Sequence, residues 1–385
     1  MKILDTVVFS IVGIYLVSAI IVGLPLLPDD WFHIEVAMNY YQRGNLEPYN
    51  YLDYAPYGRP ITYDPGVHIL LIGLRKVTGN FLSAALILKA LIWPFLIVSF
   101  WYSVKKFSHS PYIAFLSTVL VAGLFSVAFL SISIWPYTIS LAISFLLFVA
   151  YSEKRVILSS LLLASMLWLH GPPPSIIMAL FLFSIFSWRK GFHRRFLLVL
   201  FGALMLYLPR IAVMYTFYKE GMYKFAHVGI GMDMPILLWC FGLYGILIHS
   251  KRNLSSLYIF IKKEIEKFGV VEFIKKNTVM FFKTIIVPHD DEDAFVIERD
   301  SIFVFLFLSF FIWLCGYGHR FWAYSSFPLA YFSAKVLSNI KKKFCVIALV
   351  FLFSYTFVPE FVPPGELSKD ALVLYNPMQP PHPLN

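Results

Sequence analysis

The sequence predicts an all-α protein that crosses a lipid bilayer about eleven times. Of its 385 residues, 59% are hydrophobic and only 14% are charged, whereas a soluble chain carries roughly 25% charged residues. The mean hydropathy is +0.72. The apolar residues fall into successive runs that approach the roughly 20 residues a helix needs to span a bilayer. These observations exclude a soluble globular domain.

The net charge of +10 could indicate a nucleic-acid partner. The cations, however, lie in short loops between the apolar runs, where orientation in the membrane explains them. We therefore expect no nucleic-acid partner. The three cysteines all lie in apolar stretches, so neither a disulfide framework nor a cysteine metal site is predicted.

The first apolar segment, residues 5–27, follows Lys2 and ends at Pro28 without a small-residue cleavage site, which predicts an uncleaved anchor. After a polar, aromatic loop, residues 67–77 are too short to span, and we expect an interfacial helix there. Segments 156–170 and 174–188 are joined by Gly171 and three prolines, so a re-entrant hairpin is the alternative for them. The further spans are expected at 81–104, 111–131, 137–152, 156–170, 174–188, 196–214, 234–249, 302–317, 321–338 and 344–358.

Lysine and arginine gather in alternate loops, which predicts the orientation. By the positive-inside rule the amino terminus is cytoplasmic. We thus expect a transmembrane domain at 1–358 in the cell membrane, an external loop at 29–78, a cytoplasmic amphipathic loop at 251–301 and a Pro-rich external tail at 359–385. The cationic positions that set this orientation are Lys2, Lys105, Lys106, Lys154, Arg155, Arg189, Lys190, Arg194, Arg195, Lys251, Arg252 and Lys341 to Lys343.

The external loop carries the side chains best suited to chemistry. It opens Pro28-Asp29-Asp30-Trp31-Phe32-His33-Ile34-Glu35. Aspartate is a favoured helix N-cap, and with Asp30 as the cap, His33 and Glu35 fall on the first turns. Carboxylates and a histidine at the membrane surface can deprotonate a hydroxyl or bind a metal ion. The alternative is a capping aspartate with a solvated neighbour.

This loop resembles the first external loop of GT-C glycosyltransferases, most closely the archaeal oligosaccharyltransferase branch with its Asp-x-Trp/Tyr-Tyr-His-x-Arg pattern. The stretch from Asp29 to His33 matches it, which puts Asp29 on the family's catalytic or metal-binding aspartate. Further on, Gly58-Arg59-Pro60-Ile61-Thr62-Tyr63-Asp64-Pro65 is similar to the Gly-Arg-Pro-x-x-Tyr-Pro-Pro stretch that leads into a juxtamembrane helix. The resemblance covers roughly residues 1–105.

The sequence also departs from that branch. Glu35 stands where the branch usually has Arg, no Trp-Trp-Asp-Tyr-Gly sequence occurs, and residues 131–136 lack the second acidic motif. No soluble carboxy-terminal domain is expected after the last span. The resemblance therefore implies a smaller enzyme that takes one sugar from a polyprenyl-phosphate carrier.

The resemblance implies an inverting glycosyltransferase that uses a polyprenyl- or dolichyl-phosphate-linked sugar on the extracytoplasmic side. The acceptor is a glycan, lipid or protein. Asp29 or Asp30 would be the general base on the acceptor hydroxyl. A divalent ion such as Mg²⁺ or Mn²⁺ is compatible with these carboxylates, with Asp29 as its ligand.

A second constellation, from Gly316 to Trp322, joins two spans at the predicted outer face. Its His319 and Arg320 lie beside aromatic residues, and Arg binds phosphate oxygens in a bidentate manner. Arg320-Phe321 followed by Pro328 is also similar to a GT-C pattern in a late span. We expect donor phosphate binding by these residues and by Arg59. The alternative is an arginine that snorkels to the interface.

Other polar residues lie at the predicted outer ends of spans or inside them. Lys89 is inside the second span, where an ammonium is costly, so it either binds phosphate or forms an ion pair. The further substrate-site candidates are His33, Glu35, Tyr63, His68, His170 and Arg210.

Two other function classes remain open at this point. A transporter or flippase for a lipid or small solute would use Lys89, His170 and Arg210 along a pathway through the bilayer. The long acidic and aromatic loop and the lack of internal repeats favour the enzyme. A catalytically inactive GT-C-like scaffold is the third hypothesis.

Overall fold

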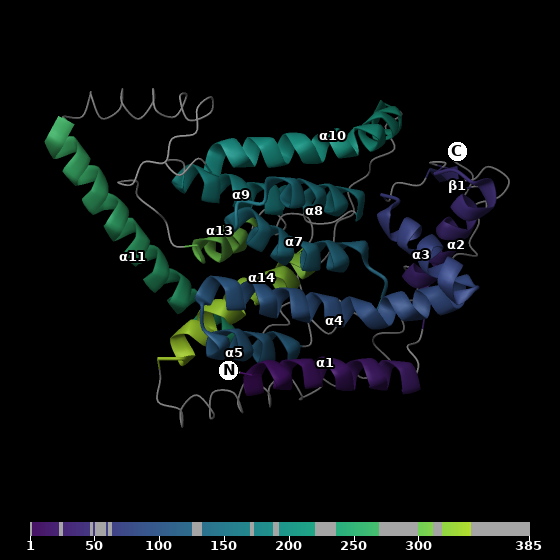
Figure 1. Cartoon of the computed structure of the whole chain (residues 1–385), viewed down its shortest axis with the longest axis horizontal. Coiled ribbons are helices and arrows are strands. Elements are labelled where there is room, and N and C mark those ends of the chain that lie inside the picture. The colour runs from purple at the N-terminus through teal and green to yellow at the C-terminus, as the bar shows by residue number, and fades with distance from the viewer. Residues whose placement is uncertain are drawn as a thin grey trace, which may run out of the picture.

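The computed structural model describes residues 2–22, 26–46, 49–50, 59–60, 64–124, 133–169, 173–187, 192–219, 236–268, 299–310 and 318–339. Apart from one pair of two-residue strands, every regular element in these ranges is a helix (Figure 1). The helices are α1 (Lys2–Val22), α2 (Pro28–Arg43), α3 (Gly66–Thr78), α4 (Phe81–Ser108), α5 (Pro111–Ala122), α7 (Pro136–Ser152), α8 (Val156–Leu169), α9 (Pro173–Phe186), α10 (Phe192–Lys219), α11 (Ile236–Phe268), α13 (Ser301–Phe310) and α14 (Gly318–Leu337).

Two described helices, Ile3–Ile21 and Phe81–Ser108, are long and apolar enough to cross a membrane, and five shorter ones are also apolar. Most residues of α1 face outward, including Ile14 and Ile20, which are 67% and 74% exposed. Such a surface is costly in water and suits lipid. Of the predicted spans, 344–358 lies outside the described residues, as does the tail at 359–385.

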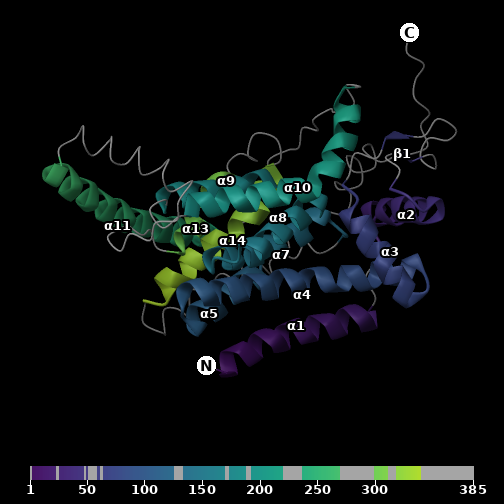
Figure 2. The ribbon, with the colours of Figure 1, turned by 45° about the horizontal axis from the view of Figure 1, so that its top comes forward.

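The core is an aromatic cluster where four helices meet. Phe100 of α4 lies 5.1 Å, ring centre to ring centre, from both Phe145 of α7 and Phe327 of α14, and 6.3 Å from Phe303 of α13. All four side chains are essentially inaccessible to solvent. Helices far apart in the chain are thus packed into one bundle (Figure 2).

At one end of this bundle, on the right in Figure 1, lie the short helices α2 and α3. We call this the loop end. The strands β1 (Tyr49–Asn50) and β2 (Arg59–Pro60) pair antiparallel in the segment between the two helices. Both helices stop at a glycine in the left-handed conformation, Gly44 and Gly79, which accepts that backbone without strain. A helix is therefore present where one was predicted at 67–77, as α3, and its place at the membrane interface stays a prediction.

Cationic side chains gather at the opposite end, which we call the basic end. Lys106 of α4 and Arg155 both pair with Glu153, at 2.9 and 3.0 Å, and Lys105 pairs with Asp5 of α1 at 2.7 Å. The sequence expectation that these lysines and arginines share one side agrees with this arrangement.

Helix α11 differs from the sequence prediction. We expected a span at 234–249 and separate amphipathic helices from residue 251. In the structure one helix runs from Ile236 to Phe268. Gly242 and Gly245 in its first half lie against Leu329 and Phe332 of α14, and its other end projects away from the bundle (Figure 1). The physical reason is that the stretch from Ser250 to Phe268 contains neither glycine nor proline, so nothing in it terminates a helix.

Candidate functional site

The loop end is organised by the first turn of α2. Pro28 occupies the first helical position, where its fixed φ and missing N–H cost nothing. The N-cap is therefore Leu27, and Asp29 and Asp30 are the second and third helical residues. The sequence expectation of Asp30 as the N-cap is wrong. Asp30 instead reaches back, and its Oδ2 accepts the Leu27 N–H at 2.8 Å.

The Asp30 carboxylate is completely buried and fully hydrogen-bonded. Its Oδ2 also accepts from the Lys89 ammonium of α4 at 2.8 Å, and its Oδ1 accepts from Ser133 Oγ at 2.7 Å and the Ile134 N–H at 2.5 Å. Burial alone would raise the pKa of Asp30, but the bonds from Lys89, Leu27, Ile134 and Ser133 outweigh it and hold the pKa below its ordinary value. Asp30 is thus a charged anchor between α2, α4 and the 133–135 segment.

Asp29, one residue earlier, points outward. Its side chain is exposed, and its Oδ2 accepts a hydrogen bond from the indole Nε1 of Trp135 at 3.0 Å. Trp135 stacks on Tyr137 at 5.1 Å between ring centres, and Tyr137 contacts Tyr324 of α14 at 6.0 Å. The buried Asp30 and the exposed Asp29 therefore have different environments, although both were candidates for the catalytic base.

His319 and Arg320 belong to the first turn of α14. Arg320 precedes Tyr324 by four residues, so the two positions share one helical face. Because Tyr324 contacts Tyr137, the start of α14 lies at the same end of the bundle as Asp29. The structure does not describe the side chains of His319 and Arg320, and their phosphate contacts remain a proposal.

A buried polar cluster lies behind α2. His33 Nδ1 and His68 Nε2 of α3 are 3.1 Å apart, and Tyr40 lies edge-on to His68 with ring centres 5.6 Å apart. Burial lowers the pKa of His68 well below its ordinary value, and His33 and Arg210 lower it further. Burial also raises the pKa of Tyr40 to about 12, against a lowering by Arg210. At neutral pH, His68 and Tyr40 are therefore both uncharged.

Asp64 links the residues just before α3 to α10. Its Oδ1 accepts from the Arg210 guanidinium at 3.1 Å and from the Tyr207 hydroxyl at 2.8 Å, and both Asp64 and Arg210 are buried. Just beyond Asp64, Gly66 allows α3 to approach α8, since a Cβ there would lie 2.5 Å from the Trp168 carbonyl oxygen. The cluster of His33, His68, Asp64 and Arg210 thus joins α2, α3 and α10 at the loop end.

For the remaining predicted site residues the structure describes fewer contacts, or none. Glu35 is half-buried on α2, and Arg59 pairs through its backbone with Asn50. Tyr63 and His170 lie outside the described residues. Sequence reasoning missed Trp135 and Tyr207. A tryptophan directly before Pro136, at the start of a helix, was the available signal for Trp135.

No protein-family model matches the sequence, and no curated protein matches it either. Among solved structures, ArnT from Cupriavidus metallidurans bound to undecaprenyl phosphate superimposes with a TM-score of 0.57 at 7% identity, over 90% of this chain and 62% of ArnT. This chain has the GT-C fold.

Two structures of the Archaeoglobus fulgidus oligosaccharyltransferase also match this chain, over 91% of its length. The complex with Zn and sulfate has a TM-score of 0.55 at 14% identity, and the AglB complex with an inhibitory peptide and a dolichol-phosphate has 0.51 at 11%. This chain spans 52% and 55% of those proteins, respectively. The likeness therefore shows the fold of a GT-C membrane protein and leaves the activity to be argued from the site.

The described residues of this chain form no site for a metal ion. No three His, Cys, Asp or Glu side chains among them lie close enough to hold a metal ion. Both oxygens of Asp30 are engaged, and His33 faces His68. These described side chains therefore do not fit a divalent ion bound by Asp29, and the proposed reaction uses none.

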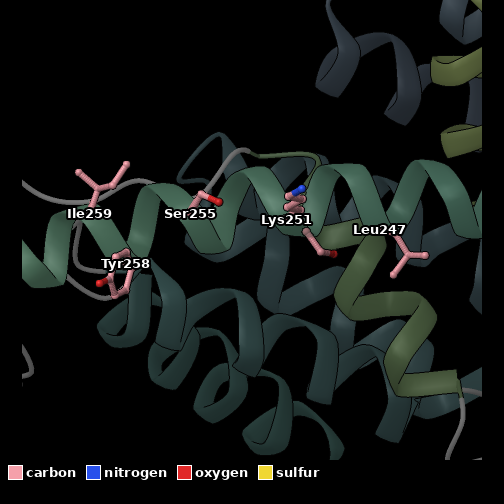
Figure 3. Close-up of a pocket in the computed structure, with 6 residues that line it drawn as sticks. Leu247, Lys251, Ser255, Tyr258 and Ile259 are labelled. Atoms are coloured by element: carbon pink, nitrogen blue, oxygen red, sulfur yellow. The ribbon is translucent and has the colours of Figure 1, made fainter.

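A hollow of about 530 Å³ runs along α11, but its lining comes from that helix alone (Figure 3). Lys251 and Ser255 sit between Leu247 and Tyr258 along its length. With no second element to bring groups together, it offers no converging chemistry and is separate from the loop-end site.

Proposed function

We propose that this protein is a membrane glycosyltransferase that transfers a sugar from a polyprenyl- or dolichyl-phosphate-linked donor to an acceptor on the extracytoplasmic side. The observation that carries the proposal is the pair of adjacent aspartates in a GT-C fold. Asp30 is locked to Lys89, and this fixes the turn that presents the exposed Asp29 beside Trp135. A rigidly supported, solvent-accessible carboxylate is what a general base requires.

In the proposed reaction, Asp29 accepts the proton of the acceptor hydroxyl. The hydroxyl oxygen attacks the anomeric carbon from the face opposite the leaving group, and the bond between that carbon and the phosphate oxygen breaks. The sugar is transferred with inversion, and the electron pair leaves on the polyprenyl phosphate. The Trp135 indole N–H holds one Asp29 oxygen, so the other is left to face the acceptor.

The leaving phosphate needs positive charge near the place where its own charge develops. We assign this role to Arg320, with His319 and Arg59 as further candidates, because the first turn of α14 lies at the loop end. The polyprenyl tail would remain in hydrocarbon while the phosphate reaches the rim. Lys89 has a different role, since its ion pair with Asp30 is buried. We assign it to positioning.

The positions of the charged groups weigh against the transporter hypothesis. A pathway through the bilayer would place Lys89 and Arg210 along its length. Both cations instead form ion pairs near the loop end, Lys89 with Asp30 and Arg210 with Asp64. This arrangement favours a site at one membrane surface.

Asp29→Asn tests the proposal directly, because it is nearly isosteric and removes the proton acceptor. We expect transfer from a panel of radiolabelled polyprenyl-phosphate hexoses to fall about 10²–10⁴-fold, the usual contribution of a general base. Donor binding, measured in parallel, should be retained. Asp5→Asn is the matched control, since Asp5 pairs with Lys105 at the basic end.

Wild-type transfer rates in Asp29→Asn would remove this residue from the chemistry. Donor binding by the wild type without transfer to any acceptor would favour the inactive scaffold instead.

A further inference from the structure

The basic end contains a second cavity that the proposed reaction does not use. It has a volume of about 300 Å³ and lies where the end of α4 and the start of α5 meet the start of α13 and the end of α14. Its lining combines apolar and basic side chains on these four helices. They are Phe107, Ser108, His109, Ile113, Arg299, Asp300, Tyr331 and Lys335.

The only carboxylate in this lining is already neutralised. Asp300 is buried, and its Oδ2 accepts from the Lys335 ammonium at 2.5 Å and the Tyr331 hydroxyl at 2.7 Å. His249 Nε2 lies 3.6 Å from the other oxygen. Burial would raise the pKa of Asp300, but Lys335 and His249 lower it below its ordinary value. The Asp300 carboxylate in the lining is therefore held in an ion pair with Lys335 and does not present a free negative charge to a ligand.

Two basic side chains of the lining are exposed. The side chains of Arg299 and His109 make no hydrogen bond or ion pair within the part of the chain that the structure describes, although Arg299 contributes long-range attraction to Glu153. His109 has a left-handed backbone, with φ of 52°, which ends α4 at the cavity. A guanidinium group that makes no ion pair can donate two parallel hydrogen bonds to two oxygens of one phosphate.

The rest of the cavity suits a ligand with an apolar part. Phe107 and Ile113 line it beside Tyr331, which stacks on Phe303. Among the described residues of this end, the cations Lys105, Lys106 and Arg155 share only two carboxylates, Asp5 and Glu153, and this excess of positive charge attracts anions.

We propose that this cavity binds a phosphate-bearing anion, with Arg299 as its principal contact and His109 as a second donor. The phosphate is that of an anionic phospholipid in the adjoining leaflet or of a free phosphate compound. The site is separate from the loop-end site and stands independently of the proposed transferase activity.

Binding to the purified full-length protein tests the inference with two probes. Short-chain phosphatidylglycerol is titrated in neutral detergent, with short-chain phosphatidylcholine as its uncharged counterpart, and inorganic phosphate is titrated separately. We expect saturable binding of one anionic probe, and at least about a tenfold loss of affinity in Arg299→Gln, since hydrogen bonds to charged groups contribute that much. Arg299 is exposed, so the variant should fold.

Arg155→Gln is the matched control, because Arg155 is an exposed cation at the same end that is already paired with Glu153. It should bind as the wild type does. Binding of phosphatidylglycerol alone identifies a lipid ligand, and binding of phosphate alone identifies a free one. No saturable binding to either probe, or equal losses in Arg299→Gln and Arg155→Gln, would overturn the inference.

Discussion

At the scale of single residues, the decisive feature is the different environment of two neighbouring aspartates. Consecutive residues on a helix point about 100° apart. Pro28 sets the start of the helix, and this start turns Asp30 into the bundle and Asp29 out of it. The buried member meets Lys89, which lies 59 residues further along the chain. A buried ion pair is costly to break by removing one partner, typically about 3–5 kcal/mol.

We predict that Asp30→Asn destabilises the protein by roughly 3–5 kcal/mol. Asparagine keeps one acceptor oxygen, but its NH₂ group replaces the other. In one orientation this NH₂ group faces the donors Ser133 and Ile134, and in the other it faces the donors Lys89 and Leu27. Lys89→Met should cost less, because Asp30 keeps three donors. Thermal unfolding in detergent measures both. In the double variant the losses should not add, since the two residues form one unit.

Asp29→Asn is the control here, because Asp29 is exposed and, among the residues that the structure describes, accepts one hydrogen bond, from Trp135 at 3.0 Å. Its stability should change by less than about 1 kcal/mol. Additive losses in the Asp30 and Lys89 double variant, or an Asp29→Asn variant as unstable as Asp30→Asn, would contradict the assignment of Asp30 as the anchor.

The sequence identified the two aspartates as a pair but could not separate their roles. Adjacent carboxylates after a span are visible in the chain, and so is Lys89 inside one. Their contact is not visible, because it depends on how α2 packs against α4. The pairing of Asp64 with Arg210 was hidden for the same reason.

At the scale of elements, prolines and glycines explain most of what the sequence predicted. Helices begin at Pro28, Pro111, Pro136 and Pro173, where proline at the first position is favourable. The interfacial helix was predicted at 67–77 and runs from Gly66 to Thr78. The helix end predicted near residue 251 was wrong, because a change from apolar to basic residues can end a membrane span without ending the helix, and α11 continues to Phe268.

We predict that Gly66→Ala weakens the junction of α3 and α8. The added Cβ would lie 2.5 Å from the Trp168 carbonyl oxygen, and the backbone of α8 cannot move aside as a flexible side chain would. Overpacking of this kind costs typically about 1–3 kcal/mol. Thermal unfolding measures the loss.

Gly73 on the same helix is the matched control, since a Cβ there meets nothing within 4 Å. Gly73→Ala should leave stability unchanged or raise it by up to about 1 kcal/mol, because alanine is the better helix former. Equal melting temperatures for the two alanine variants would show that α3 and α8 are not in tight contact.

At the scale of the whole molecule, the charged groups of the two ends are arranged differently. The loop end carries the buried ion pairs, the exposed Asp29 and the cations Arg43, Arg75 and Lys76 in the last turns of α2 and α3. The basic end carries Lys105, Lys106 and Arg155. From the lysines and arginines in alternate loops, the positive-inside rule predicts that the basic end faces the cytoplasm and that the proposed transfer reaction takes place outside. The GT-C fold holds the two ends apart by the length of α4.

Cysteine labelling tests this orientation. With the three native cysteines replaced by serine, we predict that an impermeant maleimide labels Asn45→Cys in intact cells and labels Lys154→Cys only after the membrane is opened. Both positions are exposed, at the loop end and the basic end respectively. Labelling of Lys154→Cys from outside would reverse the orientation and move the proposed reaction to the cytoplasm.

The contact between Asp64 and Arg210 also has a consequence for biosynthesis. The two residues are 146 positions apart, so at typical elongation rates the ribosome makes Arg210 roughly 7–30 s after Asp64. Until then the carboxylate must stay hydrated, and α3 cannot take its final place. We therefore expect the segment that carries Asp64 to reach its final place late, after α10 has been made, whereas Asp30 can pair with Lys89 as soon as α4 has been made.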